Sequence, residues 1–120
     1  MNLYFIRMVS SVSVKQLKSI EDLNNFVEQP GKHILFKHST TCPISAKAHE
    51  EFQSFVEETK VDAAQVFVIE DRPVSNHIAE KFDIKHESPQ IFLIEDGKVI
   101  WNTSHWKITR SSIKEAVVGE

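Results

Sequence analysis

Short, purely apolar runs recur along this 120-residue chain and constrain its fold more than any other feature. Three of them lie at residues 34–36, 66–69 and 91–94, each far shorter than the roughly 20 residues that span a membrane as a helix. The first run lies between Gly31 and a Ser/Thr cluster, which is typical of a strand buried on both faces. We therefore predict an α/β protein with a central mixed sheet flanked by helices on both faces.

The segments between these runs carry apolar residues at helical spacing, together with helix-start and turn signals. Ser19 and Thr109 are predicted N-caps, and the Asp96-Gly97 pair suits a type I′ hairpin turn. The expected strands are 13–17, 33–38, 65–70, 90–95 and 98–102, and the expected helices are 20–28, 43–60, 73–82 and 110–119. The resulting order is βαβ followed by αββα.

Composition and charge exclude several classes of protein. The chain has 14 Lys and Arg against 17 Asp and Glu, a net charge of −3, and no basic cluster, so we expect no nucleic-acid binding. We also expect no membrane association. Residues 1–11 are predicted to be a flexible lead-in and residues 12–120 a single domain, and Met8 leaves open whether residues 1–7 belong to the natural start.

Cys42 is the single cysteine, so the chain can form neither an internal disulfide nor a Cys-rich metal cage. A cytoplasmic, reducing location is expected. Cys42 follows a predicted buried strand and precedes Pro43, so it should lie at a helix start, where unpaired backbone N–H groups favour a thiolate. The alternative is an inert, buried thiol, but the polar neighbours of Cys42 favour a reactive one.

Ser45 lies where a second cysteine would complete a Cys-x-x-Cys motif, although it could equally be a helix-surface serine. His38 ends the predicted central strand and would favour the thiolate if it were protonated near Cys42. Lys47, on the following helix, is a second nearby cation. The six histidines show no helical i, i+4 pair, so we expect solvated side chains and no metal site. Trp101 and Trp106 are expected to be core or rim aromatics without an assigned role.

The segment Thr41-Cys42-Pro43-Ile44-Ser45, with Ser88-Pro89 before the hairpin, resembles the thioredoxin-like superfamily over residues 12–119. Within it, the cysteine loop is similar to that of the monothiol bacilliredoxins. This resemblance implies a thiol-disulfide oxidoreductase that removes bacillithiol, a thiol built of cysteine, glucosamine and malate, from mixed disulfides on proteins.

The resemblance also implies roles for individual residues. Cys42 would be the catalytic thiol, and Ser45 would occupy the place of the missing resolving cysteine. Pro89 would follow a cis bond and face Cys42, leaving the backbone of Ser88 to pair with an extended thiol substrate, although base rates alone favour trans. The implied substrate-binding residues are Pro89, Ser88, Thr41, Pro43, Ser45, His38 and Lys47, and the cations available to the malate carboxylates are Lys37, His38, Lys47 and His86.

The expected partners are bacillithiolated client proteins, with free bacillithiol or another redoxin as the reductant. We expect a monomer with no tightly bound cofactor, and with bacillithiol as a thiol co-substrate. One alternative is a redox-sensing or binding module whose Cys42 is merely capped by small thiols. Another is an iron–sulfur carrier like the monothiol glutaredoxins, but Pro43 stands where their Cys-Gly-Phe-Ser loop has glycine.

Overall fold

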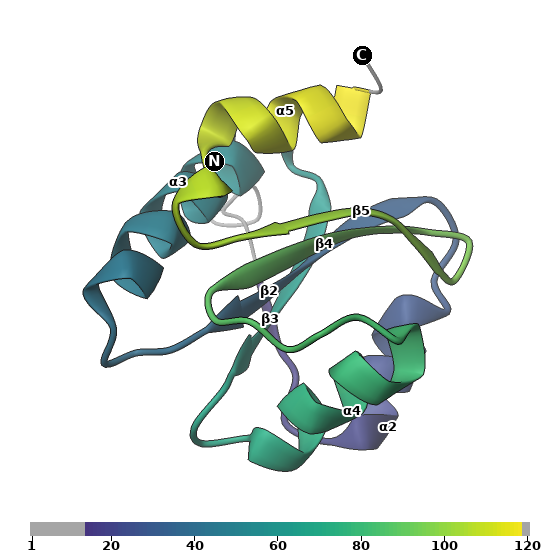
Figure 1. Cartoon of the computed structure of the whole chain (residues 1–120). Coiled ribbons are helices and arrows are strands. Elements are labelled where there is room, and N and C mark those ends of the chain that lie inside the picture. Colours follow the sequence, from purple (N-terminus) through teal and green to yellow (C-terminus); the bar gives the residue numbers. More distant parts are fainter. Residues whose placement is uncertain (1–13, 119–120) are drawn as a thin grey trace, which may run out of the picture.

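A five-stranded sheet lies between two layers of helices in the computed structural model, which describes residues 14–118 (Figure 1). The strands are β1 (Lys15–Gln16), β2 (Lys32–His38), β3 (Asp62–Phe67), β4 (Gln90–Glu95) and β5 (Lys98–Ser104). The helices are α2 (Ile20–Val27), α3 (Pro43–Thr59), α4 (Arg72–Phe82) and α5 (Arg110–Val118), with a 3₁₀ turn, η1 (His105–Lys107), before α5. The predicted fold class and element order are confirmed.

The sheet is mixed, and its strand order is β1-β3-β2-β4-β5. β2 pairs parallel with β3 and antiparallel with β4, so it is the central strand. Helices α2 and α4 cover one face and α3 and α5 the other (Figure 1). Leu35 points into the core on the α2/α4 side, whereas Ile34 and Phe36 point into the core under α3 and α5. Because both faces are covered, β2 is continuously apolar at its centre.

Capping and turn residues act as the sequence predicts. The Ser19 hydroxyl accepts the backbone N–H of Asp22 at 3.0 Å, and the Thr109 hydroxyl accepts that of Ser112 at 3.0 Å. Asp96 and Gly97 have φ values of +54° and +79°, the left-handed conformation that a type I′ turn requires at both central positions.

Strands β1 and β3 differ most from the predicted ranges, while β2 begins one residue earlier than predicted, at Lys32, and β5 ends two residues later, at Ser104. β3 begins at Asp62 rather than at 65, because Ala63 and Ala64 pair with β2 although alanine is a weak strand former. It ends at Phe67, whose carbonyl accepts the N–H of Asp71 at 2.9 Å and so starts a turn. β1 is limited to Lys15–Gln16 within the described chain. The predicted lead-in at 1–11, residues 12 and 13, the predicted end of the last helix at 119, and residue 120 lie outside the described residues.

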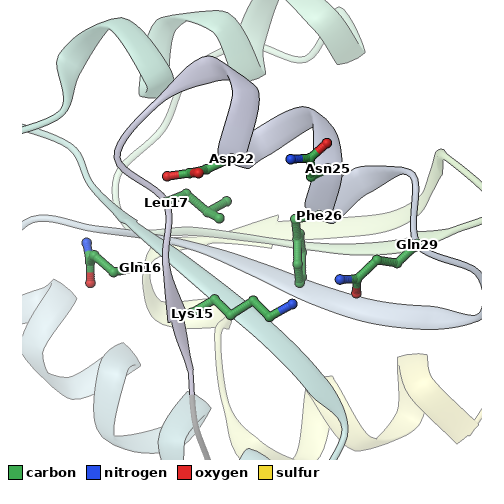
Figure 2. A pocket seen from close by; sticks show the side chains of 7 residues that line it. All are labelled: Lys15, Gln16, Leu17, Asp22, Asn25, Phe26 and Gln29. Atoms are coloured by element: carbon green, nitrogen blue, oxygen red, sulfur yellow. The ribbon is translucent and has the colours of Figure 1, made fainter.

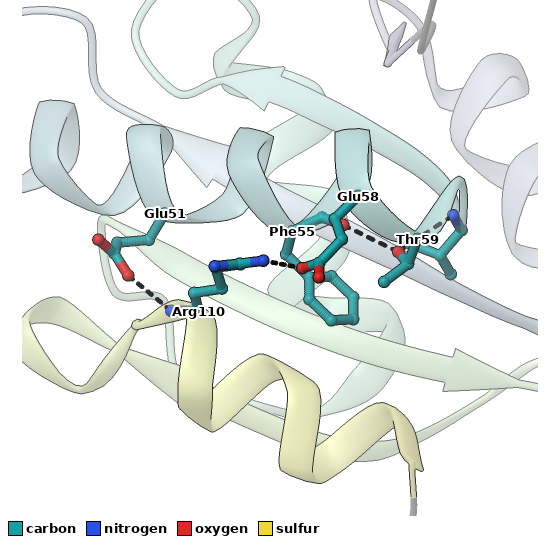
Figure 3. Close-up of polar contacts among 6 residues, drawn as sticks. Glu51, Phe55, Glu58, Thr59 and Arg110 are labelled. Atoms are coloured by element: carbon teal, nitrogen blue, oxygen red, sulfur yellow. Dashed lines mark hydrogen bonds and ion pairs between the residues drawn. The ribbon is translucent and has the colours of Figure 1, made fainter. Parts of the chain in front are cut away.

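The N-terminus of α5 is held against α3 by two glutamates (Figure 3). A carboxylate oxygen of Glu51 accepts the backbone N–H of Arg110 at 2.7 Å, and Glu58 pairs with the Arg110 guanidinium. The pKa of Glu51 lies below its usual range. The main cause is the hydrogen bond from the Arg110 N–H, and the hydrogen bond from Lys47 contributes less. Glu51 therefore supplies a negative charge at a helix start, where the helix dipole favours one.

Candidate functional site

Cys42 lies between β2 and α3 as the N-cap residue of α3, with φ −108° and ψ 123°. Its backbone N–H donates to the Ser39 carbonyl at 3.2 Å and closes a turn. Pro43 occupies the first turn of α3, as predicted. The thiol forms no capping hydrogen bond and the residue is partly exposed, so the side chain is neither sealed in the core nor used as a cap. The unpaired N–H groups of the helix start favour an anion at this position.

Ser45 is fully buried, so the interpretation as a helix-surface serine is wrong. Its Oγ accepts the backbone N–H of Ser39 at 2.9 Å and lies 2.7 Å from Nδ1 of His38. A hydroxyl has one proton, and Ser45 uses its oxygen as the acceptor for Ser39. The Ser45 O–H is therefore free to donate to Nδ1 of His38, and this pair joins the end of β2 to the first turn of α3.

His38 is 8% exposed, and its ring stacks on that of His49 with centroids 4.2 Å apart. Burial, with a smaller contribution from His49, lowers the pKa of His38 to about 4, although Glu70 opposes the shift. His38 is therefore neutral near pH 7, and in the tautomer with its proton on Nε2 its Nδ1 accepts a hydrogen bond from the Ser45 hydroxyl. The condition under which His38 would favour the Cys42 thiolate, a protonated ring, is not met near pH 7, because burial desolvates the ring.

The polar contacts continue from His49 towards the sheet edge. Nε2 of His49 lies 3.0 Å from Oε1 of Gln65, and Nε2 of Gln65 donates to Oε1 of Gln16 at 3.0 Å.

The expectation that the histidines are solvated is wrong at His38 and at His33. His33 is completely buried, with its ring edge-on to Phe26. Strand β2 buries its polar ends as well as its apolar centre.

The Ser88–Pro89 bond is cis, as the family resemblance implies and base rates do not. Lys37 pairs with Gln90 in the register of β2 and β4, so Pro89 lies level with the end of β2, beside the start of the Cys42 loop. Pro89 is buried, and its carbonyl accepts the N–H of His105 at 3.0 Å. That Pro89 faces the sulfur of Cys42, with Ser88 free to pair with a substrate, stays a prediction.

The proposed malate-binding cations have very different environments. Lys37 is fully buried, with Nζ 3.0 Å from Nδ1 of His86 and 5.8 Å from the ring centre of Phe92. Burial lowers the pKa of Lys37 to about 8; burial and then the Lys37 charge lower that of His86. Lys47, by contrast, has a side chain that is 60% exposed and lies 3.3 Å from Glu51. Among the four candidates for binding the malate carboxylates, Lys47 is therefore the one that is both charged and exposed to a ligand.

A groove of about 230 Å³ lies beside the first turns of α3, between Ile44 and Ala48 on one side and η1 on the other. It includes Lys47 and Trp106, and Trp106 is 68% exposed. The sequence interpretation gave Trp106 no role, although a large aromatic within a polar stretch directly after a strand is a signal for a surface site.

A hollow of about 360 Å³ lies over the other helical layer, between β1 and α2 (Figure 2). It is lined by polar side chains such as Lys15 and Gln29 together with the apolar Leu17 and Phe26, and its lining includes no thiol. Among residues 14–118, no group of three or more His, Cys, Asp or Glu residues could hold a metal ion. No helix in this described part is long and apolar enough to cross a membrane.

Comparisons with known proteins place these features in a family. The family model described as "Monothiol bacilliredoxin BrxC" matches residues 15–113. A solved structure described as a thioredoxin-fold protein with a proposed oxidoreductase role is 37% identical, with a TM-score of 0.82 over 96% of this chain and 98% of that chain.

Thioredoxins are more distant in sequence but similar in structure. Mitochondrial thioredoxin 3 from Saccharomyces cerevisiae is 14% identical, with a TM-score of 0.70 over 89% of this chain and 95% of that chain. The thioredoxin of Fasciola hepatica is 16% identical, with a TM-score of 0.72 over 88% and 98% of the two chains. These two likenesses show the thioredoxin-like fold.

Proposed function

This chain belongs to the monothiol bacilliredoxin family, and from that premise we propose that it removes bacillithiol from mixed disulfides on client proteins. The observation that carries the proposal is the position of Cys42: partly exposed, at the N-terminus of α3, with a side chain that forms no capping bond. A thiol in such a place is available as a thiolate nucleophile and as a leaving group.

In the first step, the Cys42 thiolate attacks the bacillithiol sulfur of the client's mixed disulfide. A Cys42–bacillithiol disulfide forms while the client–bacillithiol bond breaks, and the client sulfur leaves as a thiolate that takes a proton from solvent. The backbone beside Pro89 and the turn at Thr41 to Pro43 are proposed to align the three sulfurs.

In the second step, a thiol from outside the chain must regenerate Cys42, because the sequence contains no other cysteine. A bacillithiol thiolate attacks the bacillithiol sulfur of the adduct, which yields bacillithiol disulfide and the free Cys42 thiolate. Another redoxin could serve as the reductant in place of bacillithiol. We propose a cytoplasmic location, since this cycle requires a reducing thiol pool. We propose a monomer, since the cycle uses one Cys42 and no second copy of the chain.

Multiple-turnover release of a client thiol tests the enzymatic role against that of a capped sensor. A peptide carrying bacillithiol on its cysteine is incubated with bacillithiol, with or without catalytic protein, and the free peptide is quantified. We expect the peptide thiol to be released faster with the protein than without it. The Cys42→Ser variant should not accelerate the release at all. A protein that becomes modified at Cys42 without accelerating release would instead be a sensing or binding module.

A further inference from the structure

The groove beside α3 adjoins elements of the thiol site at two points. It begins at Ile44, two residues after Cys42 on the first turn of the helix. Its opposite wall, η1, is tied to Pro89 because the His105 N–H donates to the Pro89 carbonyl at 3.0 Å. These two links place the groove next to the elements that carry Cys42 and Pro89.

The floor and one wall of the groove are apolar. Ala48 and Ile108 are each 2% exposed and lie in the core on this side of the sheet. The indole of Trp106 is 68% exposed, whereas large aromatics on a protein surface are usually covered to a greater extent. An exposed indole beside a small apolar floor offers a flat face to a ligand.

The rim of the groove is polar. Lys47 lies 3.3 Å from Glu51, while Glu51 also accepts the Arg110 N–H at 2.7 Å. An exposed pair such as Lys47 and Glu51 contributes little stability, so the ammonium can turn to a ligand carboxylate at small cost. Glu51 keeps its bond to the α5 start, so its charge stays compensated. His105 and Thr109 add further polar groups.

We propose that this groove binds the sugar and dicarboxylate part of the small thiol attached to Cys42. The hexosamine ring would lie against the indole of Trp106, and a malate carboxylate would bind Lys47. A hexose ring has an apolar C–H face and a rim of hydroxyl groups, which matches an indole face surrounded by polar side chains. This inference rests on the proposed function and deepens it, since it gives the chain a means of distinguishing bacillithiol from a smaller thiol.

The test compares two caps on one client peptide, bacillithiol and cysteine, which share the reacting disulfide but differ in the sugar and malate. Trp106→Ala is expected to lower kcat/KM for the bacillithiol-capped peptide by about 3- to 10-fold, and for the cysteine-capped peptide by less than about twofold. Trp106→Phe keeps an aromatic face and should retain most of the preference. Ile100→Ala, at another exposed apolar side chain, should change neither value.

An equal loss on both caps would overturn the proposal, because the groove would then bind the client peptide itself. No loss on either cap would also overturn it. Lys47→Gln should reduce the preference for the bacillithiol cap in the same direction, and added salt should reduce it in the wild type.

Indole fluorescence tests the groove without any turnover. Cys42 is converted to its bacillithiol adduct or to its cysteine adduct, and the two emission spectra are compared. A difference that disappears in Trp106→Phe supports contact between the sugar and Trp106, while identical spectra contradict it. If the wild type accelerates the removal of neither cap, the proposed function fails. The comparison of the two emission spectra still decides whether the groove contacts the sugar.

Discussion

Nδ1 of His38 lies 2.7 Å from Oγ of Ser45, and this contact connects the last residue of the central strand to the first turn of the helix that begins after Cys42. The same oxygen accepts the Ser39 N–H at 2.9 Å. Ser45 therefore anchors the start of the loop that presents Cys42. The position where a resolving thiol would stand has a structural function in this chain.

Ser45→Ala should lower the free energy of unfolding by about 1 to 3 kcal/mol, because it leaves the buried Nδ1 of His38 and the N–H of Ser39 without their partner. Urea denaturation at pH 7 measures the change. Ser54→Ala, at an exposed position on the same helix, is the matched control and should be nearly neutral. Equal stabilities of the wild type and Ser45→Ala would show that these two bonds contribute nothing.

Ser45→Cys should permit an internal disulfide with Cys42, because the N-cap and third helical positions bring their side chains together at a helix start. Mild oxidation should remove two hydrogens from the intact mass and abolish reaction with a thiol reagent. Ser54→Cys, farther along α3, should keep both thiols after the same treatment. A Ser45→Cys protein that also keeps both would mean that position 45 does not face Cys42.

His38→Asn should weaken the loss of stability at acid pH. The pKa of His38 is about 4 in the folded protein, below the ordinary value of about 6.5, so the unfolded state binds more protons between these pH values. The free energy of unfolding therefore includes the full benefit of a neutral His38 above about pH 6.5. This benefit decreases as the pH falls to about 4, by on the order of 2 to 3 kcal/mol in total. Asparagine offers an acceptor without titrating. Urea denaturation at a series of pH values measures the free energy of unfolding of both proteins. If the two pH profiles were parallel, His38 would not be the source of the acid sensitivity.

Lys37→Met should raise the free energy of unfolding at pH 7 by about 1 to 3 kcal/mol, because it removes the cost of burying an ammonium that has a neutral imidazole as its partner. The pKa of Lys37 is about 8 when folded, against an ordinary value near 10.5, so the wild type should gain stability as pH rises through this interval. The advantage of Lys37→Met should therefore shrink at pH 10. A destabilised variant at pH 7 would show that the bond to His86 outweighs desolvation.

The architecture was predictable because its signals are local. The apolar run at residues 34–36, the cap at Ser19 and the Asp96-Gly97 turn each specify a nearby conformation, and the structure confirms them. The shifted start of β3 was not predictable in this way, because Ala63 and Ala64 become strand through pairing with β2. Tertiary pairing there overrides a weak local preference.

The position of the candidate site was also predictable, since a strand that ends before a Cys-Pro pair places the thiol at a helix start. The environment around it was not. Lys37 and His38 are polar residues at the end of a strand, and such residues are usually solvated. His38 is buried against His49 of α3, and Lys37 is buried beside His86 and Phe92, so their burial depends on packing rather than on sequence pattern.

The most direct measurement is a single turnover between equimolar reduced protein and a bacillithiolated peptide, followed by intact mass. If Cys42 is the attacking thiol, the bacillithiol mass moves to the protein, fragmentation locates it on Cys42, and the peptide appears as a free thiol. A protein–peptide disulfide as the main product, or undiminished transfer to Cys42→Ser, would contradict this role of Cys42.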